Sequence, residues 1–201
     1  MVTAQLTPLR VLIVYGTNEG QTARIAQYLA RVVRGRGCIA TSVDLRSVPV
    51  PRLESYDAVI VGASLHAGKY QKQVRRFVRQ YRTVLERLPS AFFSVSLTAL
   101  DPTEAGREGV QRCLDEFSQE TGWRPARVAS FAGALPYTRY RFFTRWMMKA
   151  IVRSKGSRDL DTSRNYEYTD WNSVGRFAEE FLEILEAAES PDVCSCACSS
   201  M

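Results

Sequence analysis

The chain has 201 residues, of which 45% are hydrophobic and 24% charged, a composition ordinary for a soluble globular protein that buries its own core. No apolar run reaches the length needed to cross a bilayer, and we see no export or transit signal, so we expect a cytosol-like compartment. The net charge of +6 is local, because residues 121–158 hold nine basic and no acidic side chains, and such a cluster attracts phosphate, carboxylate or anionic lipid.

Short apolar runs alternate with longer amphipathic segments, which predicts a parallel sheet covered by helices. The expected strands, in chain order, occupy residues 11–15, 39–45, 57–62, 90–96 and 128–134. The expected helices occupy residues 22–34, 72–88, 109–120 and 171–188. Five strands with interleaved helices predict the flavodoxin-like α/β architecture, a doubly wound parallel sheet with strand order 2-1-3-4-5.

One segment does not fit this alternation. Residues 136–168 form a long insertion after the fifth strand, far longer than a normal connection between a strand and a helix. Its many aromatic and basic residues favour a functional segment over a disordered one. We therefore expect a single domain at 1–189 that contains the insertion, followed by a cysteine-rich disordered tail at 190–201.

The most informative motif lies directly after the first strand and opens the first helix. It consists of Thr17, Asn18, Glu19, Gly20, Gln21 and Thr22. In an open α/β sheet, ligands bind beyond the carboxyl ends of the strands, where backbone N–H groups and a helix N-terminus converge on an anion. The loop has no lysine and matches neither the Walker pattern nor Gly-x-Gly-x-x-Gly. Neutral donors around a phosphate monoester are what FMN requires, so we predict FMN, although a plain capped turn fits the same residues.

Two further loops are expected to flank the flavin ring at the same edge of the sheet. The first follows the third strand and contributes Ser64, Leu65, His66 and Gly68. The second follows the fourth strand and contributes Ser94, Val95, Ser96, Leu97 and Thr98. His66 is the single histidine of the chain, and we interpret it as a residue that packs or hydrogen bonds near the flavin rather than one that transfers protons. We assign no catalytic residue and no metal ligand.

Residues 17–22, called the phosphate loop below, would fit any flavodoxin, whereas three other motifs are much more selective for one family: Trp123-Arg-Pro125, Tyr137-x-Arg-Tyr-Arg141 and Tyr168-Thr-Asp-Trp171. The motifs Gly62-Ala-Ser64 and Ala132-Gly-Ala-Leu135 and the run from Pro89 to Val95 accompany them. With these motifs the chain resembles the flavodoxin-like, quinone-dependent protoporphyrinogen oxidases of haem biosynthesis, also called protoporphyrinogen IX dehydrogenases. The resemblance covers nearly the whole chain, from Leu9 to about Ala187.

The resemblance implies FMN as the cofactor and protoporphyrinogen IX as the substrate, which gives up its electrons in three two-electron steps to form protoporphyrin IX. It further implies that the electrons pass to a membrane quinone, either menaquinone or ubiquinone. By the same likeness, residues 136–168 correspond to the family's long insertion, which is associated with activity, and Tyr137 joins the flavin-binding residues. The expected location is the cytoplasmic side of a membrane, as a peripheral protein, or the mitochondrial equivalent in a eukaryote.

Residues 140–152 can be drawn as a helix with a basic stripe and an apolar stripe that includes Phe143 and Trp146. Such a helix suits a membrane interface with anionic lipid, and equally a flat tetrapyrrole whose two propionates are clamped by guanidinium groups. The residues that we assign to substrate or membrane binding are Arg139, Arg141, Arg145 and Lys149. The alternative is that the apolar stripe packs on the domain and the arginines are solvated.

The tail contains three closely spaced cysteines, Cys194, Cys196 and Cys198. The last four residues formally resemble a prenylation box, with Cys194 and Cys196 as palmitoylation sites, and an unmodified tail is the alternative.

Two other functions of the same fold stay open, a flavodoxin that carries electrons between proteins and an NAD(P)H:quinone reductase. Such carriers commonly dock through an acidic face, whereas the distinguishing surface of this chain is basic. The sequence contains no nucleotide-binding fingerprint that supports the reductase. We expect no nucleic-acid partner, and the sequence leaves open the oligomeric state, including a homo-oligomer.

Overall fold

The computed structural model describes residues 7–47, 49–66, 68–135 and 166–189. The predictions for Tyr137, for the basic residues of the insertion (Arg139, Arg141, Arg145 and Lys149) and for the cysteine-rich tail lie outside these residues.

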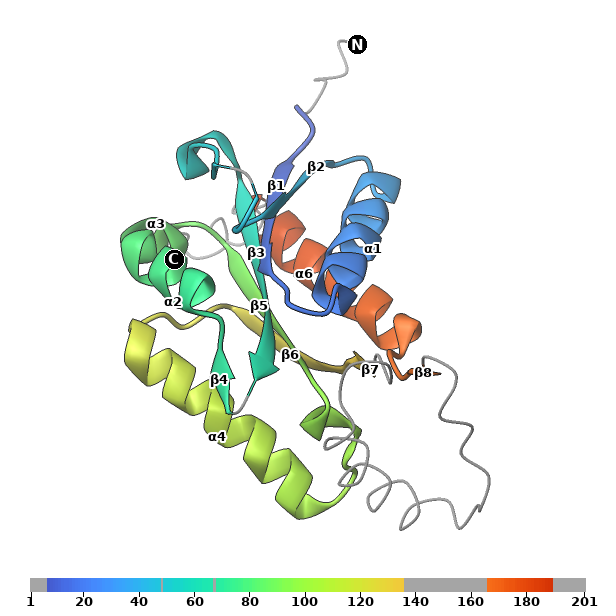
Figure 1. Ribbon diagram of the computed structural model, residues 1–201. Coiled ribbons are helices and arrows are strands. Elements are labelled where there is room, and N and C mark those ends of the chain that lie inside the picture. Colours follow the sequence, from blue (N-terminus) through green and yellow to red (C-terminus); the bar gives the residue numbers. More distant parts are fainter. Residues whose placement is uncertain (1–6, 48, 67, 136–165, 190–201) are drawn as a thin grey trace, which may run out of the picture.

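The structure is built on a parallel sheet whose strands occur in the order β2-β1-β3-β5-β6. The strands are β1 (Arg10–Gly16), β2 (Ile39–Asp44), β3 (Ala58–His66), β5 (Ser90–Ser96) and β6 (Arg127–Ala132). Numbered among themselves in chain order, these five strands have the order 2-1-3-4-5, so the predicted topology is confirmed. A short strand β4 (Lys69–Tyr70) pairs antiparallel with the end of β3. Figure 1 shows the twist of the sheet and the position of β4 at its carboxyl edge.

Helices cover both faces of the sheet (Figure 1). Helices α1 (Gln21–Gly35) and α6 (Trp171–Glu189) pack on one face, and α2 (Lys72–Gln80), α3 (Arg82–Arg87) and α4 (Glu104–Thr121) pack on the other. Two short 3₁₀ turns, Leu53–Ser55 and Thr98–Leu100, lie in the connections. The side chains of the inner strand β1 alternate between the two cores, since Val11 and Ile13 face α1 and α6, whereas Leu12 and Val14 face α2.

Two helices differ from the sequence-based prediction. The segment expected as one helix at 72–88 is interrupted at Tyr81, whose φ of −105° and ψ of 16° separate α2 from α3. Val74 in α2 and Leu85 in α3 both face the same core, so the hydrophobic periodicity of the sequence does not reveal the break between the two helices. Helix α4 begins earlier than expected because the Thr103 hydroxyl oxygen accepts a hydrogen bond from the backbone N–H of Gly106 at 3.2 Å.

The end of the sheet also differs from the prediction. Strand β6 ends at Ala132, and the next residues form β7 (Ala134–Leu135) instead of continuing the parallel sheet. Strand β7 pairs antiparallel with β8 (Tyr166–Glu167), with Ala134 opposite Glu167. Residues on the two sides of 136–165 therefore lie next to each other, and β8 leads directly to α6, whose first turn is capped by the carboxylate of Asp170.

The outer edge of β2 is partly covered by a side chain from α1. The backbone N–H of Ile39 donates to Leu9 on the β1 side at 2.7 Å, so the carbonyl group of Ala40 faces outward. The guanidinium group of Arg34, in the last turn of α1, donates to this carbonyl oxygen at 2.7 Å.

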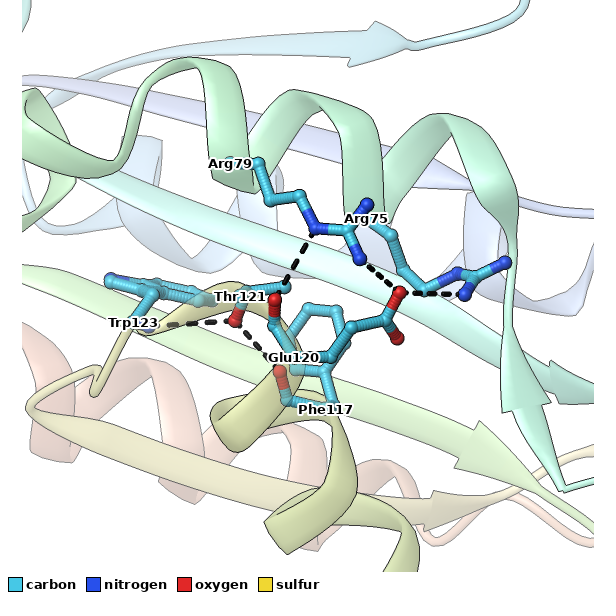
Figure 2. Close-up of polar contacts among 6 residues, drawn as sticks. All are labelled: Arg75, Arg79, Phe117, Glu120, Thr121 and Trp123. Carbon is cyan, nitrogen blue, oxygen red and sulfur yellow. Dashed lines mark hydrogen bonds and ion pairs between the residues drawn. The ribbon is translucent and has the colours of Figure 1, made fainter.

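Helices α2 and α4 are joined by a compact group of polar and aromatic contacts, shown in Figure 2. The carboxylate of Glu120 pairs with Arg75 at 2.7 Å and also with Arg79. The Thr121 hydroxyl donates to the carbonyl oxygen of Phe117 at 2.7 Å and accepts from the backbone N–H of Trp123 at 3.4 Å. Trp123 is fully buried, so these contacts close the core at the end of α4.

Tyr70 connects this aromatic core to the carboxyl edge of the sheet. Its ring packs edge-on against Phe92 and Phe117, with ring centroids 5.3 and 5.0 Å away, and only 4% of the residue is exposed. Its hydroxyl donates a hydrogen bond to the Ser94 hydroxyl oxygen at 3.0 Å. Burial disfavours the phenolate, and this raises the pKa of Tyr70 to about 12.

Replacement Tyr70→Phe is expected to change how stability depends on alkaline pH. The unfolded tyrosine ionises near the ordinary tyrosine pKa of 10, so in the wild type the free energy of unfolding decreases between pH 10 and pH 12 as the unfolded state loses the proton first. The variant lacks this decrease in the free energy of unfolding. At pH 8, however, it is less stable than the wild type by about 1 kcal/mol because the hydrogen bond to Ser94 is gone. Urea unfolding at pH 8 to 11.5 measures both effects. Parallel pH curves for the two proteins would contradict the assignment.

Candidate functional site

The connection between β1 and α1 is shaped as an anion-binding loop. Gly20 precedes the helix with a φ of +88°, a left-handed conformation that favours glycine. The Thr17 hydroxyl oxygen accepts a hydrogen bond from the backbone N–H of Gly20 at 2.9 Å, which closes the turn. Within the described part of the chain no side chain caps α1, and its first turn carries no acidic residue. The N–H groups of the first helical turn are therefore available to an external anion.

Thr22 carries a polar group that no described residue satisfies. The residue is 1% exposed, and its hydroxyl is buried with no hydrogen-bond partner among the residues that the structure describes. A buried hydroxyl without a partner costs about 1–3 kcal/mol. An anion oxygen held at the N-terminus of α1 would supply the partner, so the donor set of neutral hydroxyl and amide groups fits a phosphate monoester such as that of FMN.

A cation lies beside this loop that the sequence analysis did not identify. The guanidinium group of Arg46, in the turn after β2, donates to the carbonyl oxygen of Thr17 at 2.9 Å and to the side-chain oxygen of Asn18 at 3.4 Å. It holds the outer half of the loop and adds positive charge there. Because β2 and β1 are parallel neighbours, the turns after them lie side by side, and this was the signal that could have suggested Arg46 as a neighbour of the loop.

The side chain of Gln21 turns away from the loop. Gln21 is 5% exposed, and its amide nitrogen donates to the Thr169 hydroxyl oxygen at 2.8 Å and to a carboxylate oxygen of Glu167 at 3.1 Å. Only the backbone of Gln21 therefore faces the expected anion. Glu19, the one charged residue of the loop, is half-buried.

The second predicted group of residues belongs to a hairpin rather than to a free loop. Ser64, Leu65 and His66 are the last residues of β3, and Gly68, with a φ of +77°, forms the turn into β4. Strand β3 was predicted to end at Gly62, and it is longer because Leu65 pairs with Tyr70 across the hairpin. Ser64 is buried, Leu65 is half-buried and His66 is exposed.

Gln71 joins this hairpin to the end of β1, and no local pattern in the sequence indicated this role. Its side-chain oxygen accepts from the backbone N–H of Ser64 at 3.1 Å, and its amide nitrogen donates to the Ser64 hydroxyl. Gly16 lies directly against it, because a Cβ at Gly16 would come within 3.4 Å of the Gln71 side-chain oxygen and 2.6 Å of Val74. A side chain at Gly16 would therefore push the two elements apart.

The third predicted group is divided between the core and the surface. Ser94, Val95 and Ser96 are buried at the end of β5, where Ser94 accepts from Tyr70 and Ser96 accepts from the backbone N–H of Ala99 at 3.1 Å. Leu97 and Thr98 are half-exposed and lead into the 3₁₀ turn. Leu97 and Thr98 are therefore the two of these five residues whose side chains are exposed enough to contact a ligand above the edge of the sheet.

The strand register brings the three groups together. Gly16 pairs with Ala63, and Ser64 pairs with Val95, so β1, β3 and β5 end side by side. This is the edge at which doubly wound sheets bind their ligands. The phosphate loop follows β1 directly, so it lies with the ends of β3 and β5 at this one edge of the sheet.

The comparisons with known proteins agree with this geometry. Residues 12–161 match Flavodoxin_5, a flavodoxin domain. The chain is 37% identical to the protoporphyrinogen IX dehydrogenase [quinone] of Escherichia coli (strain K12) over 178 residues, which are 89% of this chain and 97% of that protein. It is 35% identical to the protein of the same name from Leishmania major, with 87% and 75% of the two chains covered.

Solved flavodoxins share the fold. The oxidised flavodoxin 1 of Bacillus cereus has a TM-score of 0.53 at 17% identity, with 87% of this chain and 97% of that chain covered. A short-chain flavodoxin associated with a bacterial microcompartment has a TM-score of 0.53 at 12% identity, with 88% and 99% covered. The chain therefore belongs to the flavodoxin domain family and to the family of the quinone-linked protoporphyrinogen IX dehydrogenases.

Proposed function

We propose that this protein oxidises protoporphyrinogen IX to protoporphyrin IX with FMN as its cofactor and passes the electrons to a quinone. The observation that carries the proposal is the 37% identity to a protoporphyrinogen IX dehydrogenase [quinone] along 97% of that protein. The loop between β1 and α1 supports it independently, because an unpaired buried hydroxyl and uncapped helical N–H groups suit the phosphate of FMN.

The overall reaction removes six electrons and six protons from one porphyrinogen and reduces three quinones to quinols. FMN supplies the ability to accept electrons in pairs and to return them to a second acceptor. The residues of the protein bind the cofactor and the substrate and position them. Thr17, Gly20 and Thr22 hold the phosphate end, while Leu65, His66, Leu97 and Thr98 border the flavin ring.

The insertion is the proposed contact with the substrate and with an anionic membrane surface. Arg139, Arg141, Arg145 and Lys149 match the charge of the two propionates and of acidic headgroups, and Tyr137 is the proposed additional flavin contact. A quinone dissolved in the bilayer would then be reached by a peripheral protein. In the described part of the chain, no helix combines the length and apolar character that a membrane span needs.

An anaerobic assay with purified protein tests the proposal. Protoporphyrinogen is supplied with and without a quinone, and porphyrin fluorescence is followed. Quinone-dependent formation of porphyrin is the expected result. Turnover of the quinone only with NAD(P)H as donor would favour the reductase, and reduction of the flavin without any porphyrin would favour an electron carrier.

The variant Thr22→Val tests the phosphate site. It keeps the side-chain shape and removes the hydroxyl, so we expect the dissociation constant of FMN to rise roughly ten- to a hundredfold, as for the loss of a hydrogen bond to a charged group. The apoprotein should keep or gain stability, because the hydroxyl has no partner to lose within the described residues. Flavin fluorescence quenching measures the affinity, and thermal unfolding of the apoprotein measures the stability.

The matched control is Thr121→Val, which removes a buried hydroxyl that does have a partner, the carbonyl oxygen of Phe117. This variant should lose about 1 kcal/mol of stability and keep its affinity for FMN. If Thr22→Val instead behaves like Thr121→Val, the Thr22 hydroxyl has no role toward the cofactor.

Deletion of residues 137–158 tests the role of the insertion. Because β7 and β8 pair antiparallel, the residues that remain can close the gap as a short loop. We expect porphyrinogen turnover to be abolished while FMN, measured by flavin fluorescence, still binds, with a weaker affinity because the deletion also removes the proposed Tyr137 contact. Bound FMN serves as the control for folding, and unchanged turnover would remove the insertion from the proposed mechanism.

A further inference from the structure

The phosphate loop and the strand that follows the insertion are joined by one side chain. Gln21 is the first residue of α1, and its amide nitrogen bridges to Glu167 in β8 and to Thr169 in the next turn. The Thr169 hydroxyl in turn donates to the carbonyl oxygen of Ala132 at the end of β6, at 2.8 Å. The contacts connect residues 146 and 148 positions apart in the chain.

The donor capacity of this side chain is used up by these contacts. A primary amide nitrogen has two N–H donors, and the Gln21 nitrogen has two acceptors, at 2.8 and 3.1 Å. Its side-chain oxygen accepts from Arg24 at 3.3 Å, and Arg24 also pairs with Glu167 at 2.9 Å. The side chain therefore has no donor left for a phosphate, and its place in the loop is explained by β8.

We propose that Gln21 is a positioning residue that couples the phosphate loop to strand β8, so that FMN bound at the loop and the anchorage of β8 stabilise each other. This inference rests on the proposed binding of FMN. The backbone N–H of Gln21 belongs to the helix turn that faces the anion, and its side chain holds Glu167 and Thr169. Gln21 thus belongs to the phosphate loop through its backbone and to the β8 contact through its side chain. An anion that orders the backbone of Gln21 therefore also orders the side chain that holds β8.

Thermodynamic linkage makes this coupling measurable from either side. If FMN strengthens the attachment of β8, then weakening that attachment must weaken FMN binding by the same factor. Glu167 lies outside the phosphate loop, and its side chain is 30% exposed. Its carboxylate accepts a hydrogen bond from the Gln21 amide. A change at Glu167 therefore reports coupling rather than direct contact with the cofactor.

The first experiment measures FMN affinity by flavin fluorescence in Glu167→Ala and Glu167→Gln. Loss of the acceptor in Glu167→Ala should raise the dissociation constant about three- to tenfold, the range for one net hydrogen bond. Glu167→Gln keeps a side-chain oxygen for Gln21 and removes only the exposed pair with Arg24, so it should restore affinity close to that of the wild type. Gln21→Ala should weaken binding as much as the double variant with Glu167→Ala, because both remove the same contact.

The second experiment follows amide hydrogen exchange at residues 166–169 with and without FMN. The wild type should exchange several-fold more slowly here when FMN is added, and Gln21→Ala should lose this effect while residues 17–22 still respond. Gln27→Ala, an exposed glutamine of the same helix, is the matched control and should behave as the wild type.

The outcomes separate the two proposals. A wild-type protein that binds no FMN overturns the proposed function and the coupling together. Normal FMN binding with equal affinity in Glu167→Ala, or with no change of exchange at residues 166–169, overturns the coupling and leaves the proposed function standing.

Discussion

The site depends on the helical N–H groups at the start of α1, which the protein leaves without a side-chain cap in its described part. Gly20 takes a left-handed conformation directly before the first helical residue, and Thr17 closes the turn that leads from β1 to it. Most helices satisfy these groups internally. Here the neighbouring Thr22 hydroxyl also has no partner among the described residues, so the loop suits a ligand that brings several acceptor oxygens.

The residues around the phosphate loop hold it in place but do not cap its helical N–H groups, in the part of the chain that the structure describes. Arg46 binds its outer half, Gln21 ties its inner half to β8, and the close approach of Gln71 to Gly16 fixes the neighbouring strand end. Behind the site, Tyr70 joins Ser94 to the aromatic core. These contacts restrict the rotamers and backbone around the site, so the donors are already oriented before an anion arrives.

The sequence was sufficient for the strand order and for the position of the loop between β1 and α1, because a buried strand, a glycine and a helix in succession allow few other arrangements. It was insufficient at Tyr81, where both helical pieces keep the same buried stripe, and at β3, where pairing with β4 extends the strand. Contacts between distant residues, such as those of Arg46 and Gln71, follow from tertiary packing and leave no local pattern. Ser94 illustrates the same limit, since its type and place suit a ligand but its hydroxyl is occupied by Tyr70.

The guanidinium group of Arg34 has a consequence for the sheet as a whole. β2 is an edge strand, and unpaired carbonyl groups on such a strand can template the addition of a strand from another molecule. Because Arg34 already occupies the outward carbonyl oxygen of Ala40, a foreign strand could align there only by displacing a charged side chain. The first helix therefore also protects the protein against edge-to-edge aggregation.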